Sequence, residues 1–218
     1  MPKWAKTLIA VLLLPFCIGA VKALILVVGR TGRADSVWVA LLGGAACWVV
    51  VFVTLPRPMW LYVVGHELTH AVWTWLFGGK VKKFKATSQG GHVVVSKSNF
   101  VIALAPYFFP IYAVLLMVVF LIGHLIWDWN RWSPWFHLLL GAAYAFHATL
   151  TFHVLKTRQS DITSQGYLFS AVIIFLGNIL VLLVALPLLT GQANLLSVFG
   201  LWLEATGTVL RKIGRLFA

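Results

Sequence analysis

A short motif with the spacing of a metal site lies inside an apolar stretch of the chain. His66, Glu67 and His70 form the pattern His-Glu-x-x-His. In a helix, residues four apart lie one turn apart on the same face, so both imidazoles can bind one ion while Glu67 lies toward its bound water. Zinc accepts neutral imidazoles and lowers the pKa of its bound water to about 7. The pattern therefore predicts a zinc site in which Glu67 is the general base.

The apolar residues around the motif strengthen this prediction. An ionisable side chain at the middle of a membrane span costs about 2.5 to 3.5 kcal/mol even on the mildest scale, so such residues are usually functional. The alternative is that the three polar side chains only join helices by hydrogen bonds. We expect metal binding, because the pattern places two histidines and one of only two glutamates at fixed spacing.

A catalytic zinc ion takes three protein ligands and keeps one position open, so one more ligand must come from elsewhere in the chain. The chain has five acidic residues: Asp35, Glu67, Asp128, Asp161 and Glu204. Two predicted crossings separate the connector after His70 from the connector that holds Asp161, which puts both on one side of the membrane. At 1.5 Å per residue His70 lies about 12 Å from that end of its helix, so Asp161 can reach it. His147 and His153, on the predicted helix before Asp161, are alternative ligands.

The composition is typical of a membrane protein. Of 218 residues, 61% are hydrophobic and only 10% are charged, and the mean hydropathy is +0.94. The net charge of +12 does not favour nucleic-acid binding, because the cations form small groups between apolar runs, as at membrane-helix ends. Cys17 and Cys47 lack Cys-x-x-Cys spacing, which indicates neither a disulfide framework nor a thiolate metal site.

Six apolar runs approach or exceed the roughly 20 residues that a helix needs to cross a bilayer. They cover residues 7–29, 36–55, 59–77, 99–127, 135–155 and 162–189. Gly78 and Gly79 predict the end of the third run. Pro106 and Pro110 predict a kink in the fourth, because each removes a backbone donor. We therefore expect an all-α polytopic membrane protein with about six transmembrane helices.

Two further segments have distinct patterns. The basic connector 80–98 contains β-favouring runs at 81–85 and 92–95 with Gly90 and Gly91 between them, which predicts a short surface β-hairpin; an ordinary positively charged loop is the alternative. Residues 195–217 alternate apolar with small and polar side chains and end in a basic group, which predicts a C-terminal interfacial amphipathic helix.

Taken together, these residues resemble the site-2 protease family, the intramembrane zinc metalloproteases that cut transmembrane substrates. The resemblance covers about residues 58–189: the motif within a span, a glycine-bounded hairpin after it, a polar and proline-containing next span, and an aspartate about ninety residues on. It implies that His66, His70 and Asp161 ligate zinc and that Glu67 activates water for peptide-bond hydrolysis. It also implies a transmembrane protein or peptide as substrate.

The expected organisation has three parts: two N-terminal transmembrane helices in 1–57, a metalloprotease-like membrane core in 58–190, and the amphipathic helix in 191–218. With the connector 80–98 in the cytoplasm, nine Lys and Arg lie inside and seven outside. This favours a multi-pass protein of the cell inner or plasma membrane, with its active site nearer the cytoplasmic face. The alternative function is a non-proteolytic membrane adaptor or complex subunit that keeps a structural metal site.

Overall fold

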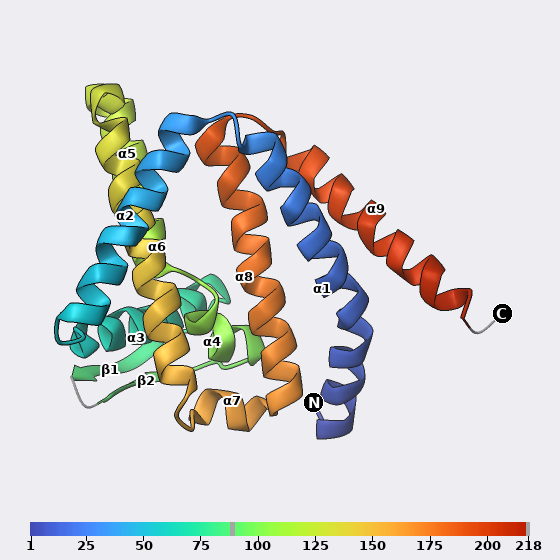
Figure 1. Cartoon of the computed structure of the whole chain (residues 1–218). Coiled ribbons are helices and arrows are strands. Elements are labelled where there is room, and N and C mark those ends of the chain that lie inside the picture. The colour runs from blue at the N-terminus through green and yellow to red at the C-terminus, as the bar shows by residue number, and fades with distance from the viewer. Residues whose placement is uncertain (88–89, 217–218) are drawn as a thin grey trace. The chain divides into compact units, whose positions relative to one another are not determined.

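The computed structural model describes residues 1–87 and 90–216 (Figure 1). The described residues are mostly helical, with a two-stranded antiparallel sheet, as the sequence predicts. By its contacts the chain divides into two compact units. The terminal unit comprises Met1–Asp35 and Ser160–Ala218, and the central unit comprises Ser36–Gln159. The three-part division expected from the sequence stays a prediction.

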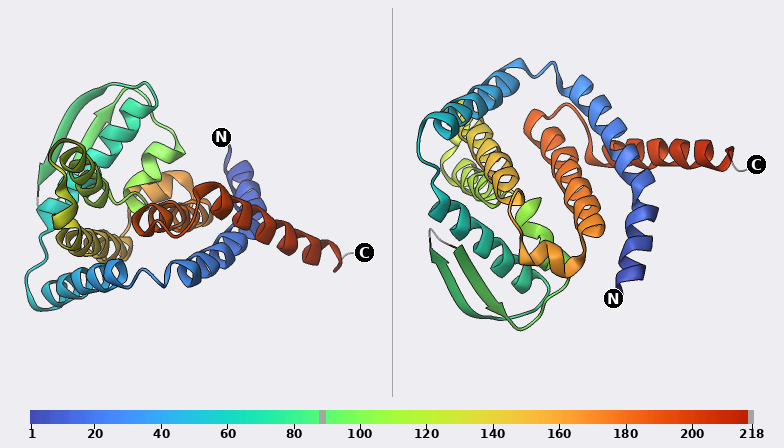
Figure 2. Two further views of the ribbon diagram at one scale, coloured as in Figure 1. Left: turned by 90° about the horizontal axis from the view of Figure 1, so that it is seen from above. Right: turned by 60° about the horizontal axis from the view of Figure 1, so that its bottom comes forward.

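The terminal unit is a group of helices. Its members are α1 (Lys3–Thr31), α7 (Ser160–Gln165), α8 (Tyr167–Thr190) and α9 (Leu195–Gly214). Helix α1 runs beside α8 and also contacts α9 (Figure 2). A Cβ atom on Gly19 of α1 would lie 2.8 Å from the Thr206 amide nitrogen of α9, so the two backbones approach closely there. The Trp202 indole donates a hydrogen bond to the Phe16 carbonyl at 2.9 Å, which fixes the same contact.

The central unit contains longer helices, the sheet and several short helices. Its elements are α2 (Asp35–Thr54), α3 (Met59–Leu76), β1 (Val81–Thr87), β2 (Gly90–Val95), α4 (Phe100–Leu104), η1 (Ala105–Tyr107), α5 (Ile111–Trp127), η2 (Trp129–Trp132) and α6 (Ser133–Leu155). The hairpin of β1 and β2 packs on α3 (Figure 2). A core of Tyr62, Phe146 and Leu150 joins α3 to α6.

Helices α2 and α6 pack through glycine. A Cβ atom on Gly44 would collide with the Leu138 carbonyl, and one on Gly141 would collide with the Leu41 carbonyl. Small residues allow this close approach in membrane-type helix pairs. Next to them the Trp48 indole donates a hydrogen bond to the Thr149 hydroxyl at 2.8 Å.

Four helical segments of the described chain are long and apolar enough to cross a membrane: Lys3–Thr31, Asp35–Thr54, Trp129–Leu155 and Tyr167–Thr190. A fifth arises if Phe100–Tyr107 and Ile111–Trp127 form one bent span, with 84° between the two parts. That bend confirms the kink predicted from Pro106 and Pro110. Helix α3, expected as another span, is not in this set, so the count of about six spans stays a prediction.

The hairpin predicted at 80–98 is confirmed, but its glycines are not its turn. Gly90 and Gly91 are the first two residues of β2, where they pair with Thr87 and Ala86 of β1. The connection between the strands falls at residues 88–89, outside the described residues. A glycine in a strand often marks a close approach of other atoms, and Gly91 has this role on α3, as described below.

The C-terminal segment forms the predicted helix. Asn194 caps α9, its side chain accepting a hydrogen bond from the Leu196 amide at 2.8 Å. Val198, Thr206 and Val209 are buried, whereas Leu196 and Leu203 are exposed. An interfacial position for this amphipathic helix stays a prediction, and Phe217 lies outside the described residues.

Candidate functional site

Helix α3 carries the His-Glu-x-x-His motif, and local sequence determines where the helix ends. Gly78 has a φ of 68°, a left-handed conformation that favours glycine after a helix. The Gly79 amide donates to the Thr74 carbonyl at 2.8 Å, which satisfies one of the last free carbonyls. The prediction that these glycines end the helix is confirmed.

Tyr112 of α5 fixes the motif-bearing face of α3. Its hydroxyl donates a hydrogen bond to the Leu61 carbonyl at 2.6 Å. A Cβ atom on Gly65 would lie 2.6 Å from the Cε2 atom of the tyrosine ring. The glycine that precedes His66 therefore allows the ring to pack directly against the helix backbone.

The two histidines of the motif lie together on one face of α3. Their ring centroids are 4.9 Å apart and the ring planes meet at 78°. His70 is only 8% exposed, and its Nδ1 lies 2.8 Å from the Ile102 carbonyl oxygen. Because a carbonyl only accepts, Nδ1 must carry the proton and Nε2 keeps its lone pair. Zinc-ligating histidines are commonly oriented in this way, so His70 fits a metal ligand.

Glu67 lies beneath the hairpin. It is 6% exposed, although it carries a carboxyl group. A Cβ atom on Gly91 of β2 would lie 2.7 Å from Glu67 Cγ and 2.8 Å from Val63 Cγ1. The missing side chain at Gly91 therefore allows β2 to pass directly over the glutamate and cover it.

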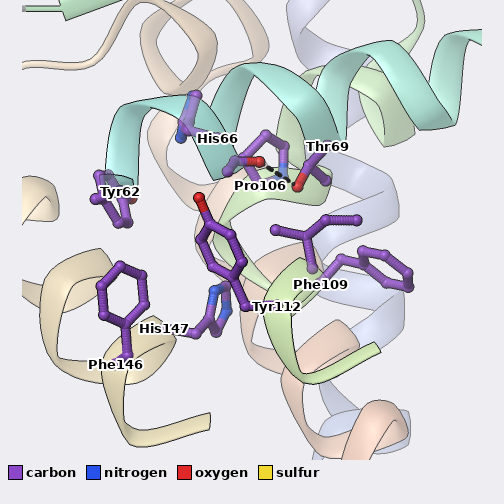
Figure 3. A pocket seen from close by; sticks show the side chains of 10 residues that line it. Tyr62, His66, Thr69, Pro106, Phe109, Tyr112, Phe146 and His147 are labelled. Carbon is purple, nitrogen blue, oxygen red and sulfur yellow. Dashed lines mark hydrogen bonds between the residues drawn. The ribbon is translucent and has the colours of Figure 1, made fainter. Parts of the chain in front are cut away.

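His66 borders a cavity between α3, α5 and α6 (Figure 3). The cavity is lined by Tyr62, Gly65, His66, Thr69, Pro106, Phe109, Ile111, Tyr112, Phe146 and His147. On another side the His66 ring meets the fully buried Tyr107 ring edge to face, with centroids 5.2 Å apart. The surroundings of this ligand candidate are thus mainly aromatic.

Asp161 lies in the first turn of α7 and is partly buried. Helix α7 ends at Gln165, and Gly166, with a φ of 94°, separates it from α8. Among the described residues, His66, His70 and Asp161 are a His-His-Asp group that could hold a metal ion. The histidines belong to the central unit and the aspartate to the terminal unit. His153, an alternative ligand from the sequence, lies in the last turn of α6.

Residue spacing did not indicate the groups that support the motif. The acceptor for His70 is a backbone carbonyl, which no residue type marks. Tyr112 is one of five tyrosines without a distinctive neighbour pattern. Gly91 gave a signal, but a turn was the expected reason for it. The chain matches no family model, no curated protein and no solved structure.

Proposed function

We propose that the chain is an integral, multi-pass membrane zinc metalloprotease that hydrolyses peptide bonds of membrane-protein substrates. The orientation of His70 carries this proposal: its Nδ1 is bound to the Ile102 carbonyl, and its Nε2 keeps the lone pair that a metal needs. A histidine that only joined helices would also be buried and hydrogen-bonded, so the proposal also depends on the second imidazole, His66, which lies beside it on the same face. The sequence motif supplies the other groups at the spacing that this chemistry uses.

Zinc is the metal we propose, held by His66, His70 and Asp161. Two imidazoles and one carboxylate are a ligand set that catalytic zinc sites use, with a fourth position left for water or substrate. When bound there, zinc would polarise the scissile carbonyl and lower the pKa of a bound water. Along the chain, Asp161 comes only six residues after Leu155, the last residue of α6.

Glu67 is the general base in this proposal. Its carboxylate takes a proton from the attacking water and then gives it to the leaving amine. Its burial under Gly91 supports the role, because a covered carboxylate is held in one place. Substrates would be membrane helices that unwind locally, since an intact helix shields its peptide bonds. The hairpin beside Glu67 could hold such an extended segment by strand addition.

The test is Glu67→Gln in the full chain reconstituted in liposomes. We expect zinc content to stay as in the wild type, measured by mass spectrometry. Cleavage of a quenched-fluorescent reporter transmembrane peptide should fall roughly 10²- to 10⁴-fold, because the general base is lost. Glu204→Gln on the exposed part of α9 makes the same chemical change and should leave both quantities unchanged.

Cleavage by the Glu67→Gln protein at the wild-type rate would contradict the proposal. A wild-type protein that binds zinc but cleaves no reporter would instead favour the adaptor with a structural metal site.

A further inference from the structure

His147 on α6 is a buried histidine that the proposed mechanism does not use. It is 8% exposed, and its Nε2 has no hydrogen-bond partner among the described residues. A buried nitrogen without a partner is unfavourable and is rare in folded proteins. Its partner is therefore expected to be a molecule that enters from outside the chain.

The cavity described above is where such a molecule would meet Nε2. Figure 3 shows the His147 ring beside Tyr112, facing the space under α3, and His66 borders the same cavity. The cavity holds about 260 Å³ of space free of protein atoms, part of it open to the outside. Most of this volume is open space, and the enclosed part has room for about one water-sized group, which suits the carbonyl oxygen of a peptide but not a larger ligand.

Two hydroxyl groups of the lining, those of Thr69 and Tyr112, are already bound to backbone carbonyls. The Thr69 hydroxyl donates to the Gly65 carbonyl at 2.8 Å, and the Tyr112 hydroxyl donates to the Leu61 carbonyl. Much of the remaining lining is aromatic or aliphatic. An entering peptide group thus finds in His147 a nitrogen whose hydrogen-bonding capacity is unused.

We propose that His147 Nε2–H donates a hydrogen bond to the carbonyl oxygen of the scissile peptide; this rests on the proposed protease function. As the water oxygen bonds to the carbonyl carbon, the π electrons move to the carbonyl oxygen, and Glu67 takes the water proton. The C–N bond then breaks, and the proton passes to the amine. A donor aimed at the oxygen stabilises the charge that develops there, so His147 is a further catalytic residue.

Replacing His147 with glutamine or with asparagine tests this, because the two amide side chains have similar polarity and differ in length by one carbon. The terminal amide of His147→Gln can reach the position of Nε2, whereas that of His147→Asn is one carbon shorter and cannot. We expect His147→Asn to lower kcat on the reporter peptide roughly 10²- to 10³-fold with little change in KM. His147→Gln should recover at least about tenfold of that loss, and His147→Leu should match the asparagine variant.

A binding measurement gives a readout independent of turnover. A peptidyl phosphinate of the reporter sequence carries charged oxygens where the carbonyl oxygen becomes charged. Its affinity, measured by calorimetry, should fall in the asparagine variant and return with glutamine, while zinc content stays constant. His137→Leu makes the same chemical change near the start of the same helix and should change none of these quantities.

Equal kcat in the glutamine and asparagine variants would overturn the inference, and so would wild-type kcat in the leucine variant. Loss of zinc in all three variants would also overturn it, because His147 would then be a metal ligand. These outcomes differ from failure of the proposed function itself, in which the wild type cleaves no reporter or Glu67→Gln cleaves normally.

Discussion

In two contacts of the central unit, a glycine lets the backbone of one element approach the next element closely. The two contacts differ in which atoms face the glycine. Between α2 and α6, Gly44 and Gly141 each face a backbone carbonyl of the other helix. Between β2 and α3, Gly91 faces the side chain of the buried Glu67. The first contact brings helices together, whereas the second keeps an acidic group covered beside two histidines. The atoms that face each glycine therefore distinguish a helix-packing contact from a contact at the proposed active site.

The contact at Gly91 differs from the contact between α2 and α6 only if α3 carries a metal centre. Loss of a metal ligand is therefore the change with the largest expected effect. We expect Asp161→Asn to weaken zinc binding at least about tenfold to a hundredfold, since even supporting residues cost this much, and to abolish cleavage. Competition with a chelating dye measures the affinity. His153→Leu should bind zinc normally; if it loses zinc and Asp161→Asn does not, the third ligand has been assigned wrongly.

Enlarging Gly91 should affect activity more than stability. In Gly91→Ala the new methyl group needs the space of Glu67 Cγ and of the Lys85 carbonyl, which lies 2.8 Å from the Cβ position. A displacement of about 1 Å at a catalytic group can cost about 10²-fold in rate, so we expect a fall of about tenfold to a hundredfold in kcat. Zinc content should be unchanged. The control is Gly200→Ala on α9, where a Cβ atom meets nothing within 4 Å.

Enlarging the glycines between α2 and α6 should do the opposite. Gly141→Ala forces a methyl group into the Leu41 carbonyl, and overpacking of this kind typically costs about 1 to 3 kcal/mol. Thermal unfolding in detergent measures this loss, and kcat per folded molecule should stay at the wild-type value. Gly43→Ala, whose Cβ position is open, should be neutral or slightly stabilising. Reduced kcat in Gly141→Ala without lower stability would remove the distinction between the contacts.

The smallest effect is expected at Tyr112, which supports α3 from another side. Tyr112→Phe keeps the ring against Gly65 but loses the hydrogen bond to the Leu61 carbonyl. A typical hydrogen bond contributes about 1 kcal/mol, so unfolding should shift modestly and kcat by only a few fold. A large loss of zinc in this variant would mean that the hydroxyl, and not the ring, orients the motif.

Apolar runs predicted most of the helices and prolines predicted the bend. Both signals can be read from residue types alone, because hydrophobicity and the lack of a backbone donor do not depend on the tertiary fold. The hairpin was predicted from β-favouring residues, but the role of Gly91 was not, since a turn and a close approach produce the same glycine signal. The helix α3 was predicted, and its histidines fall on one face as their spacing requires. The partner of His70 could not be read from spacing, because it depends on which carbonyl the tertiary fold brings to the ring.

The proline-containing bend after α4 explains why that carbonyl is available. In a continuous helix the Ile102 carbonyl would accept from the amide of residue 106, but Pro106 has no N–H. The neighbouring Ala105 amide does not replace it, because that amide donates to the Val101 carbonyl. The Ile102 carbonyl oxygen is thus left without a helical donor, and a buried carbonyl needs one. His70 Nδ1 supplies that hydrogen bond. The proline at position 106 therefore does two things. It bends the chain, and it leaves a carbonyl that selects the Nδ1-protonated tautomer of a histidine on another helix.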